Sequence, residues 1–288
     1  MKRGALNLKF LKWSTVIIIL GSVLILTAAK LFPGEIYLME TYLLDFSDKS
    51  IPAPTDEILT KETNAKKLLE SGAVLSDSLM LVNNDYPLSE NYSPEITEYK
   101  GVVMNPFTAK GYIGLKEAIY NEFGTNLYIM SSFRTPEEQS AIIDSGNEYA
   151  ADIYSSEHLT GLALDVYVKY HAGMGFIDSD EGQFVNNFCQ NYGFIIRYPY
   201  YGEKATGIPY EPWHIRYVGF PHSEIITENR LTLEEYVLSL IPGKIYVYNE
   251  YFILRQNLNE DLCIPKGSYD IEISPDNTGF YIISGKYK

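Results

Sequence analysis

The chain has 288 residues, enough for one sizeable domain and a smaller appendage. Its formal net charge is −14, and because the first twelve residues carry four basic side chains and no acidic one, the remainder carries −18. Such acidity argues against nucleic acid or an anionic lipid surface as a partner. The two cysteines, Cys189 and Cys263, are too few for a disulfide framework, and their pairing with each other stays open.

An apolar run from Trp13 to Ala29 follows the basic segment 1–12. Lys30 can extend its charge to the membrane surface, and two further apolar residues lengthen the run, so we expect a transmembrane signal anchor over 13–32. The basic residues before it predict a cytoplasmic N-terminus, with the rest of the chain outside. A cleavable signal peptide is the alternative, because Thr27-Ala28-Ala29 is an acceptable small-residue cleavage site.

Residues 33–72 have the composition of a stalk with one short helix over 65–71. A strand is expected over 79–83, and the main domain over 73–240. Within it, helical spacing covers 108–123, and Thr135 with Pro136 predicts the start of a helix that runs towards residue 151.

The predicted strands of the main domain span 126–133, 161–168, 193–198 and 213–218, with a helix over 180–192. Helices and strands follow no regular βαβ repeat, which predicts an α+β fold with a small, mainly antiparallel sheet. Residues 241–288 are rich in β-formers and predict three or four strands, either as a β appendage or as strands added to the main domain.

Two of the four histidines stand at defined spacings from carboxylates. Hydrolytic zinc sites use three protein ligands, usually imidazoles and carboxylates, and His158, Asp165 and His214 form such a set. Glu211 stands three positions before His214 and is the candidate general base for a metal-activated water. Strand alternation predicts His214 on the opposite face from Trp213 and its apolar neighbours.

The stretch Ser-Glu-His-x-x-Gly-x-Ala-x-Asp at 156–165, followed by Glu-Pro-Trp-His-x-Arg-Tyr-Val-Gly at 211–219, resembles the signature of VanY-type zinc D-alanyl-D-alanine carboxypeptidases. That group includes peptidoglycan L,D-carboxypeptidases and VanX-like dipeptidases. Ser-x-Phe-Arg-Thr at 131–135 is similar to a third family motif, with Ser132 in place of glycine and Phe133 in place of tyrosine. The resemblance covers about residues 95–225.

The resemblance implies one zinc per chain, held by His158, Asp165 and His214, with Glu211 as general base and acid. It also implies that Arg134 stabilises the oxyanion of the scissile carbonyl or anchors the substrate carboxylate, which suits a permanently charged guanidinium. Ser156 is expected to hold the C-terminal end of the substrate, although a serine there can also cap a turn. Gln139, early in the helix after Arg134, is a further candidate for substrate binding.

The other two histidines, His171 and His222, lie outside the motifs, and we expect both to be solvated. Aromatic side chains near the site can bind sugars or peptides, but packing explains most of them equally well.

The function that the resemblance implies is a membrane-anchored D,D-carboxypeptidase that releases D-alanine from peptidoglycan stem peptides, facing the cell wall. The signatures do not separate it from an L,D-carboxypeptidase on tetrapeptide stems. A non-catalytic wall-binding protein is the alternative from another class, and the intact set of ligands, base and arginine counts against it. Removal of terminal D-alanine destroys the ligand of vancomycin-type drugs, so glycopeptide resistance and wall maturation both stay open, as does the oligomeric state.

Overall fold

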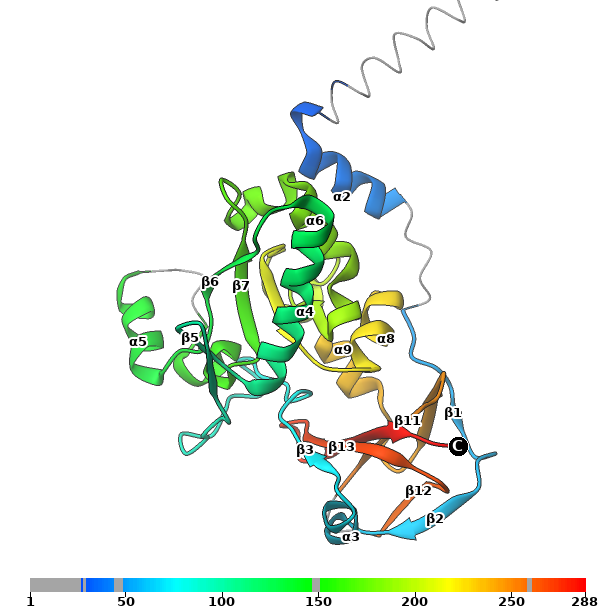
Figure 1. Cartoon of the computed structure of the whole chain (residues 1–288). Helices are drawn as coiled ribbons and strands as arrows, with labels where there is room; N and C mark the ends of the chain where they lie inside the picture. The colour runs from blue at the N-terminus through cyan, green and yellow to red at the C-terminus, as the bar shows by residue number, and fades with distance from the viewer. Residues whose placement is uncertain (1–26, 28–29, 44–48, 147–150, 258–260) are drawn as a thin grey trace, which may run out of the picture.

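The computed structural model describes residues 27, 30–43, 49–146, 151–257 and 261–288 (Figure 1). Most of the predicted anchor at 13–32 lies outside these residues. Among the residues that are described, no helix is long and apolar enough to cross a membrane. The first well-defined element is α2 (Pro33–Leu43), whose Gly34 backbone N–H donates to Asp178.

A four-stranded antiparallel sheet forms the centre of the main domain. Its order is β6-β7-β9-β8, and its strands span Tyr128–Ser131, Ala163–Tyr167, His214–Tyr217 and Phe194–Ile196 respectively. All four fall within the ranges predicted from the sequence. The mixed α+β fold with a small antiparallel sheet is therefore confirmed.

Two helices, α4 (Pro106–Phe123) and α6 (Asp180–Phe188), lie beside this sheet (Figure 1). α4 begins at Pro106 because Asn105 caps its first turn, and it ends at Gly124 in the left-handed conformation. Side chains of both helices share one buried cluster with alternate residues of the sheet: Leu115, Ile119, Val185, Leu164, Val166 and Ile215. The opposite face of β7 and β9 is left for polar side chains.

Shorter elements complete this part of the molecule. α5 (Pro136–Asp144) starts with the predicted Thr135 cap, which forms a capping box with Glu138, but it ends well before residue 151. The others are the hairpin β4 (Thr97–Tyr99) and β5 (Val102–Met104), the 3-10 turns η1 (Ile153–Ser155), η2 (Glu157–Thr160), η3 (Gly173–Asp178) and η4 (Cys189–Tyr192), and the helices α7 (Glu203–Thr206), α8 (His222–Glu228) and α9 (Leu233–Ser239).

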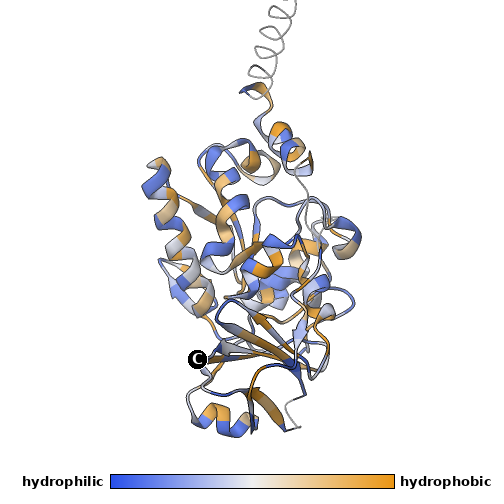
Figure 2. Ribbon diagram, turned by 90° about the vertical axis from the view of Figure 1, so that its right-hand side faces the viewer, coloured by the Kyte–Doolittle hydropathy of each residue, from blue (hydrophilic) through white to orange (hydrophobic). Residues whose placement is uncertain are grey.

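The C-terminal segment forms five strands rather than three or four: β10 (Ile245–Tyr248), β11 (Tyr251–Gln256), β12 (Leu262–Pro265), β13 (Tyr269–Pro275) and β14 (Tyr281–Lys286). They pair with two strands of the predicted stalk, β1 (Pro54–Thr55) and β2 (Thr60–Thr63), and with β3 (Val74–Leu75) at the start of the predicted main domain, near the helix α3 (Ala65–Glu70). One sheet has the order β1-β10-β11-β14-β13-β3 and a second pairs β12 with β2. In Figures 1 and 2 these segments form one module at one end of the molecule, with hydrophobic and hydrophilic residues mixed along its strands.

The strand expected over 79–83 is wrong. Leu79 and Leu81 are fully buried, and their backbone N–H groups bond to Ser274 and Asp276 in the C-terminal module. Their apolar pattern therefore reflects burial between the module and the main domain rather than a sheet ladder.

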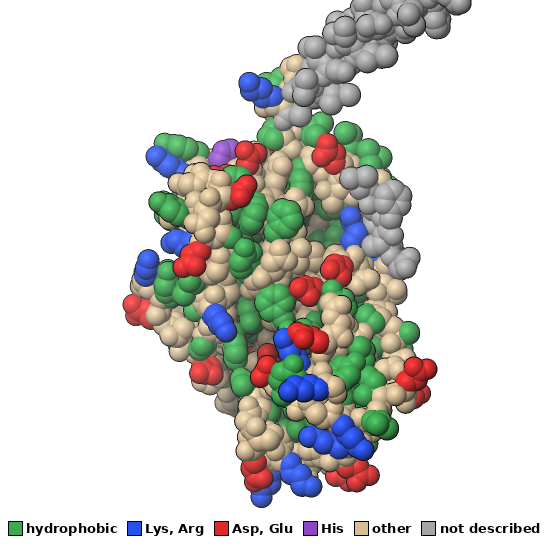
Figure 3. Space-filling model, turned by 45° about the vertical axis from the view of Figure 1, so that its right-hand side comes forward, with side chains coloured by type: hydrophobic (Ala, Val, Ile, Leu, Met, Phe, Trp, Pro, Cys, Tyr) green, Lys and Arg blue, Asp and Glu red, His purple; other side chains and the backbone are tan. Residues whose placement is uncertain are grey.

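Charged side chains of both signs are interspersed among hydrophobic ones on the face shown in Figure 3. No large field of a single sign gathers on this face, although the chain is strongly acidic as a whole. Both cysteines are free, with Cys189 buried and Cys263 exposed.

The expectation of a solvated His222 is also wrong, while His171 is half-buried. His222 is buried at the junction of the two parts, where its Nδ1 lies 2.6 Å from the Tyr236 hydroxyl of α9 and its Nε2 lies 3.1 Å from the Ser284 hydroxyl of β14. A neutral imidazole matches two hydroxyl partners, since one nitrogen donates and the other accepts. Burial lowers the pKa of His222 to about 3.

We predict that His222 makes the fold sensitive to mild acid. Its pKa is lower in the folded chain than the unfolded value of 6.5, so below that pH the unfolded chain binds the extra proton and stability falls as the pH falls. Between pH 7 and pH 5 the wild type should lose about 2 kcal/mol more than His222→Gln. Urea unfolding of both proteins at the two pH values measures the difference, and parallel losses would contradict the assignment.

Candidate active site

His158 lies in η2, in a tight turn that ends at Gly161. The imidazole is buried, and its Nδ1 lies 2.7 Å from the Ser132 carbonyl oxygen. A carbonyl only accepts, so Nδ1 carries the hydrogen and Nε2 is left as a lone-pair donor. The turn therefore presents His158 in the tautomer that a metal ligand requires.

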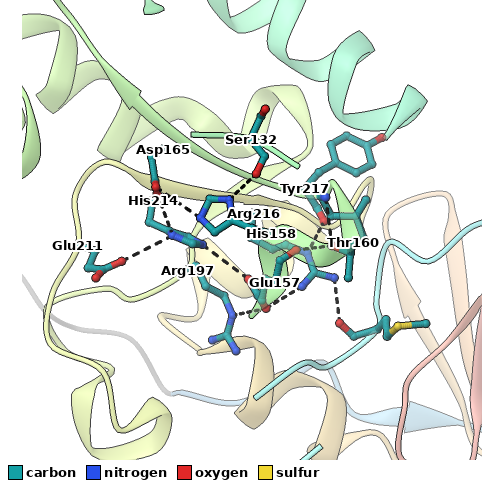
Figure 4. A network of polar contacts seen from close by, with 12 residues as sticks. Ser132, Glu157, His158, Thr160, Asp165, Arg197, Glu211, His214, Arg216 and Tyr217 are labelled. Carbon is teal, nitrogen blue, oxygen red and sulfur yellow. Dashed lines mark hydrogen bonds and ion pairs between the residues drawn. The ribbon is translucent and has the colours of Figure 1, made fainter. Parts of the chain in front are cut away.

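Asp165 and His214 are directly opposite each other on β7 and β9. Asp165 Oδ2 lies 3.4 Å from His158 Nε2, and Asp165 Oδ1 lies 3.1 Å from His214 Nδ1. One nitrogen or oxygen atom from each of the three side chains falls within 4.8 Å of the others, and all three residues are buried (Figure 4). Asp165 Oδ1 has no hydrogen-bond partner. Two imidazoles and one carboxylate in this arrangement fit a single zinc ion with an open position.

The surrounding protein groups shift the pKa values of all three side chains. Burial opposes charge on His214, but the nearby carboxylates of Asp165, Glu157 and Glu211 outweigh it and raise its pKa to about 9. Burial is likewise outweighed at Asp165, whose pKa is lowered by the two histidines, whereas burial lowers the pKa of His158. A metal must therefore displace a proton from His214 at neutral pH.

Glu211 stands in the turn before β9, where its backbone N–H donates to the Tyr198 carbonyl and its own carbonyl accepts from the N–H of His214. Its carboxylate Oε2 is 3.6 Å from His214 Nδ1, and 22% of the side chain is exposed. Burial raises the pKa of Glu211. A carboxylate that borders the metal ligands, reaches solvent and has a raised pKa can exchange protons with a water molecule in the site.

Arg134 follows β6 and borders the same group. Its guanidinium donates to Ser131 Oγ at 2.8 and 3.1 Å, to Gln139 Oε1 at 3.1 Å and to Asp165 Oδ2 at 3.4 Å. Gln139 is buried and donates its own amide to the Ala151 carbonyl. The structure thus places Gln139 behind Arg134, and its predicted contact with substrate stays a prediction.

Ser156 is buried immediately before η2, and its side chain makes no capping hydrogen bond there. The alternative role as a turn cap is therefore not seen.

Sequence reasoning missed Glu157. It lies next to a ligand in the chain, but its carboxylate is directed towards His214 and two buried arginines, Arg197 and Arg216 (Figure 4). Lone acidic residues inside a motif give little signal. The signal that was available is the presence of an arginine on each of two predicted strands, 193–198 and 213–218, because an arginine that becomes buried needs a carboxylate partner.

The comparison with known sequences identifies the family. The VanY profile, described as D-alanyl-D-alanine carboxypeptidase, matches residues 103–220. The chain is 35% identical over 179 residues to VanXYC of Enterococcus gallinarum, a bifunctional D-Ala-D-Ala dipeptidase and D-Ala-D-Ala carboxypeptidase, which covers 56% of this chain and 93% of that protein. The chain therefore belongs to the VanY family.

Solved structures show the same fold. The D,D-dipeptidase VanXYg, in complex with a D-Ala-D-Ala phosphinate analogue, matches with a TM-score of 0.62 and 27% identity over 80% of this chain and 99% of that one. The D,D-pentapeptidase VanY of a VanB-type resistance cassette, in complex with Zn(II), matches with a TM-score of 0.50 and 28% identity. The match covers 56% of this chain and 99% of that one. The LD-carboxypeptidase LdcB matches with a TM-score of 0.51 and 27% identity. The match covers 67% of this chain and 97% of that one.

We predict that Gly161 is required for the turn that presents His158. Its φ is +70°, and an added Cβ would lie 2.8 Å from the backbone nitrogen of Asn105. Gly124 is the matched control, because its φ is +68° but nothing lies within 4 Å of the added Cβ. Gly124→Ala should cost about 1 kcal/mol for the left-handed backbone, and Gly161→Ala about 1–3 kcal/mol more for the clash. Equal losses in urea unfolding would show that the close approach has no effect.

Proposed function

We propose that this protein is a zinc-dependent D-alanyl-D-alanine carboxypeptidase that releases D-alanine from peptidoglycan stem peptides. Membership of the VanY family supports the reaction class. The observation that carries the proposal is the position of Glu211 and Arg134 on the border of a buried two-histidine, one-aspartate group.

Each residue has a distinct part in the proposed reaction. His158, Asp165 and His214 would hold the zinc ion, which supplies Lewis-acid polarisation of the scissile carbonyl and a lowered pKa for water. Glu211 takes a proton from the attacking water and delivers it to the amine nitrogen of the leaving D-alanine, so that the peptide bond and one water become a carboxylate and an amine. Arg134 stabilises the negative charge on the carbonyl oxygen, or holds the substrate carboxylate. Ser156 helps to hold the C-terminal end of the substrate.

The location is part of the same proposal. We place the catalytic part outside the cell, on the wall side, with residues 13–32 as the membrane anchor and one zinc per chain. The basic N-terminal residues and the apolar run support this orientation.

An L,D-carboxypeptidase acting on tetrapeptide stems is the second candidate. The likeness to the LD-carboxypeptidase LdcB supports it, because its TM-score of 0.51 is close to the 0.50 of the D,D-pentapeptidase. The zinc ligands and base would be the same in both.

We predict that the purified full chain releases D-alanine from a pentapeptide that ends in D-Ala-D-Ala, and that a zinc chelator abolishes the release. The matching tetrapeptide is the comparison substrate, and free D-alanine is the readout. Release from the tetrapeptide alone would move the protein to the L,D class. Release from neither substrate by a folded, zinc-loaded chain would contradict both candidates.

We predict that Glu211→Gln lowers kcat by about 10²–10⁴-fold because the proton carrier is lost, while zinc binding stays close to that of the wild type. Glu203→Gln, which changes an exposed glutamate of α7, is the control and should keep full activity. Steady-state kinetics and zinc titration measure the two effects separately. Full activity in Glu211→Gln would remove Glu211 from the mechanism.

A further inference from the structure

The two ring nitrogens of His214 face different carboxylates (Figure 4). Nδ1 lies 3.1 Å from Asp165 Oδ1 and 3.6 Å from Glu211 Oε2, on the side of the proposed metal. Nε2 lies 3.8 Å from Glu157 Oε2, which is too long for a hydrogen bond. Both Nε2 and Glu157 Oε2 are buried, and neither has a hydrogen-bond partner among the residues that the structure describes. Two complementary groups thus face each other across a gap about 1 Å longer than a hydrogen bond.

The other oxygen of Glu157 is firmly held. Oε1 accepts from Arg197 Nε at 2.7 Å and from Arg216 NH1 at 2.6 Å, and both arginines are fully buried. Arg197 also donates to Glu234 Oε2 of α9 at 2.9 Å, and Arg216 also donates to the Met80 carbonyl at 2.9 Å. Contacts from β8, β9, α9 and the segment before β4 therefore fix the position of the Glu157 carboxylate.

The chemistry of a bound histidine requires an acceptor at the place where Glu157 stands. If His214 Nδ1 binds the metal, the ring hydrogen is on Nε2. A buried N–H without an acceptor costs about 1–3 kcal/mol. Histidines that bind metals usually donate their second N–H to a carboxylate, a carbonyl or water, and this contact sets the tautomer and the orientation of the ring.

We propose that Glu157 is a positioning residue that accepts the Nε2 hydrogen of His214 and thereby directs Nδ1 to the metal. This inference rests on the metal site of the proposed function. It adds a role for Glu157, the residue next to His158. In this role Glu157 contacts neither the substrate nor the metal, and it affects the metal only through its hydrogen bond to His214.

The first test compares Glu157→Gln with Glu234→Gln in the full chain. Each variant removes one carboxylate partner of Arg197 at nearly constant volume, but Glu234 contacts Arg197 and Asn83, not His214. In Glu157→Gln the two arginines would still donate hydrogen bonds to the one remaining side-chain oxygen. The amide nitrogen would then face the Nε2 hydrogen of His214, which places two hydrogen-bond donors against each other. Zinc titration should show a 10–100-fold weaker Kd for Glu157→Gln and a change within about threefold for Glu234→Gln.

Equal weakening in both variants would show that Glu157 acts only through the stability of the arginine cluster, and would overturn the proposal. An unchanged Kd in Glu157→Gln would overturn it as well. If the wild type itself fails to bind zinc, the proposed metal site is wrong, which is a separate outcome.

The second test needs no variant and covers the case in which Glu157→Gln does not fold. ¹⁵N-histidine NMR of the zinc-loaded wild type reports which nitrogen of each ring carries the hydrogen. We expect His158 to carry it on Nδ1 and His214 to carry it on Nε2, with the Nε2 proton of His214 shifted downfield and slow to exchange. Binding of His214 through Nε2, or a rapidly exchanging Nε2 proton, would overturn the proposal.

Discussion

The pairing of Asp165 with His214 across β7 and β9 is the constraint on which the site depends. Because the two residues are opposite each other in an antiparallel ladder, the sheet itself sets the separation of two ligand side chains that are far apart in the chain. A register shift of one residue would exchange the polar and apolar faces of a strand. The packing of Leu164, Val166 and Ile215 against α4 and α6 opposes such a shift, so the core and the site support the same register.

Beside His214, four buried charged residues form a cluster that stability alone does not explain: Glu157, Arg197, Arg216 and Glu234. Removing charges from water is costly, and hydrophobic side chains of similar volume often serve folding as well or better. The cluster is electrically balanced, and the arginines outweigh burial to keep the pKa of Glu157 low. What it provides is a fixed negative group beside His214, which an apolar core could not supply.

The grouping of the proposed ligands, base and arginine could be predicted from the sequence because their motifs place rare residue types at fixed spacings on or beside short strands. The alternation that buries Ile215 and turns His214 to the other face follows from the same local pattern. The rest depends on contacts between distant segments. The strands of residues 54–75 have their partners in residues 245–275, and the surroundings of His222 include Ser284. No local pattern reveals such partners, so a stalk and a solvated histidine were the expected structures.

The interleaving of both ends of the chain in one module affects how the molecule can be assembled. β1, β2 and β3 are synthesised before the main domain, yet each of them pairs with a strand that follows it. During synthesis these segments must therefore remain without their strand partners until β10, β12 and β13 have been made. In the chain, the main domain lies between the strands β1 to β3 and the strands β10 to β14. Pairing of these two groups of strands therefore also brings the two ends of the main domain together. The β module can therefore form only after residues 245–275 have been synthesised, and its formation fixes the segments on both sides of the main domain against each other.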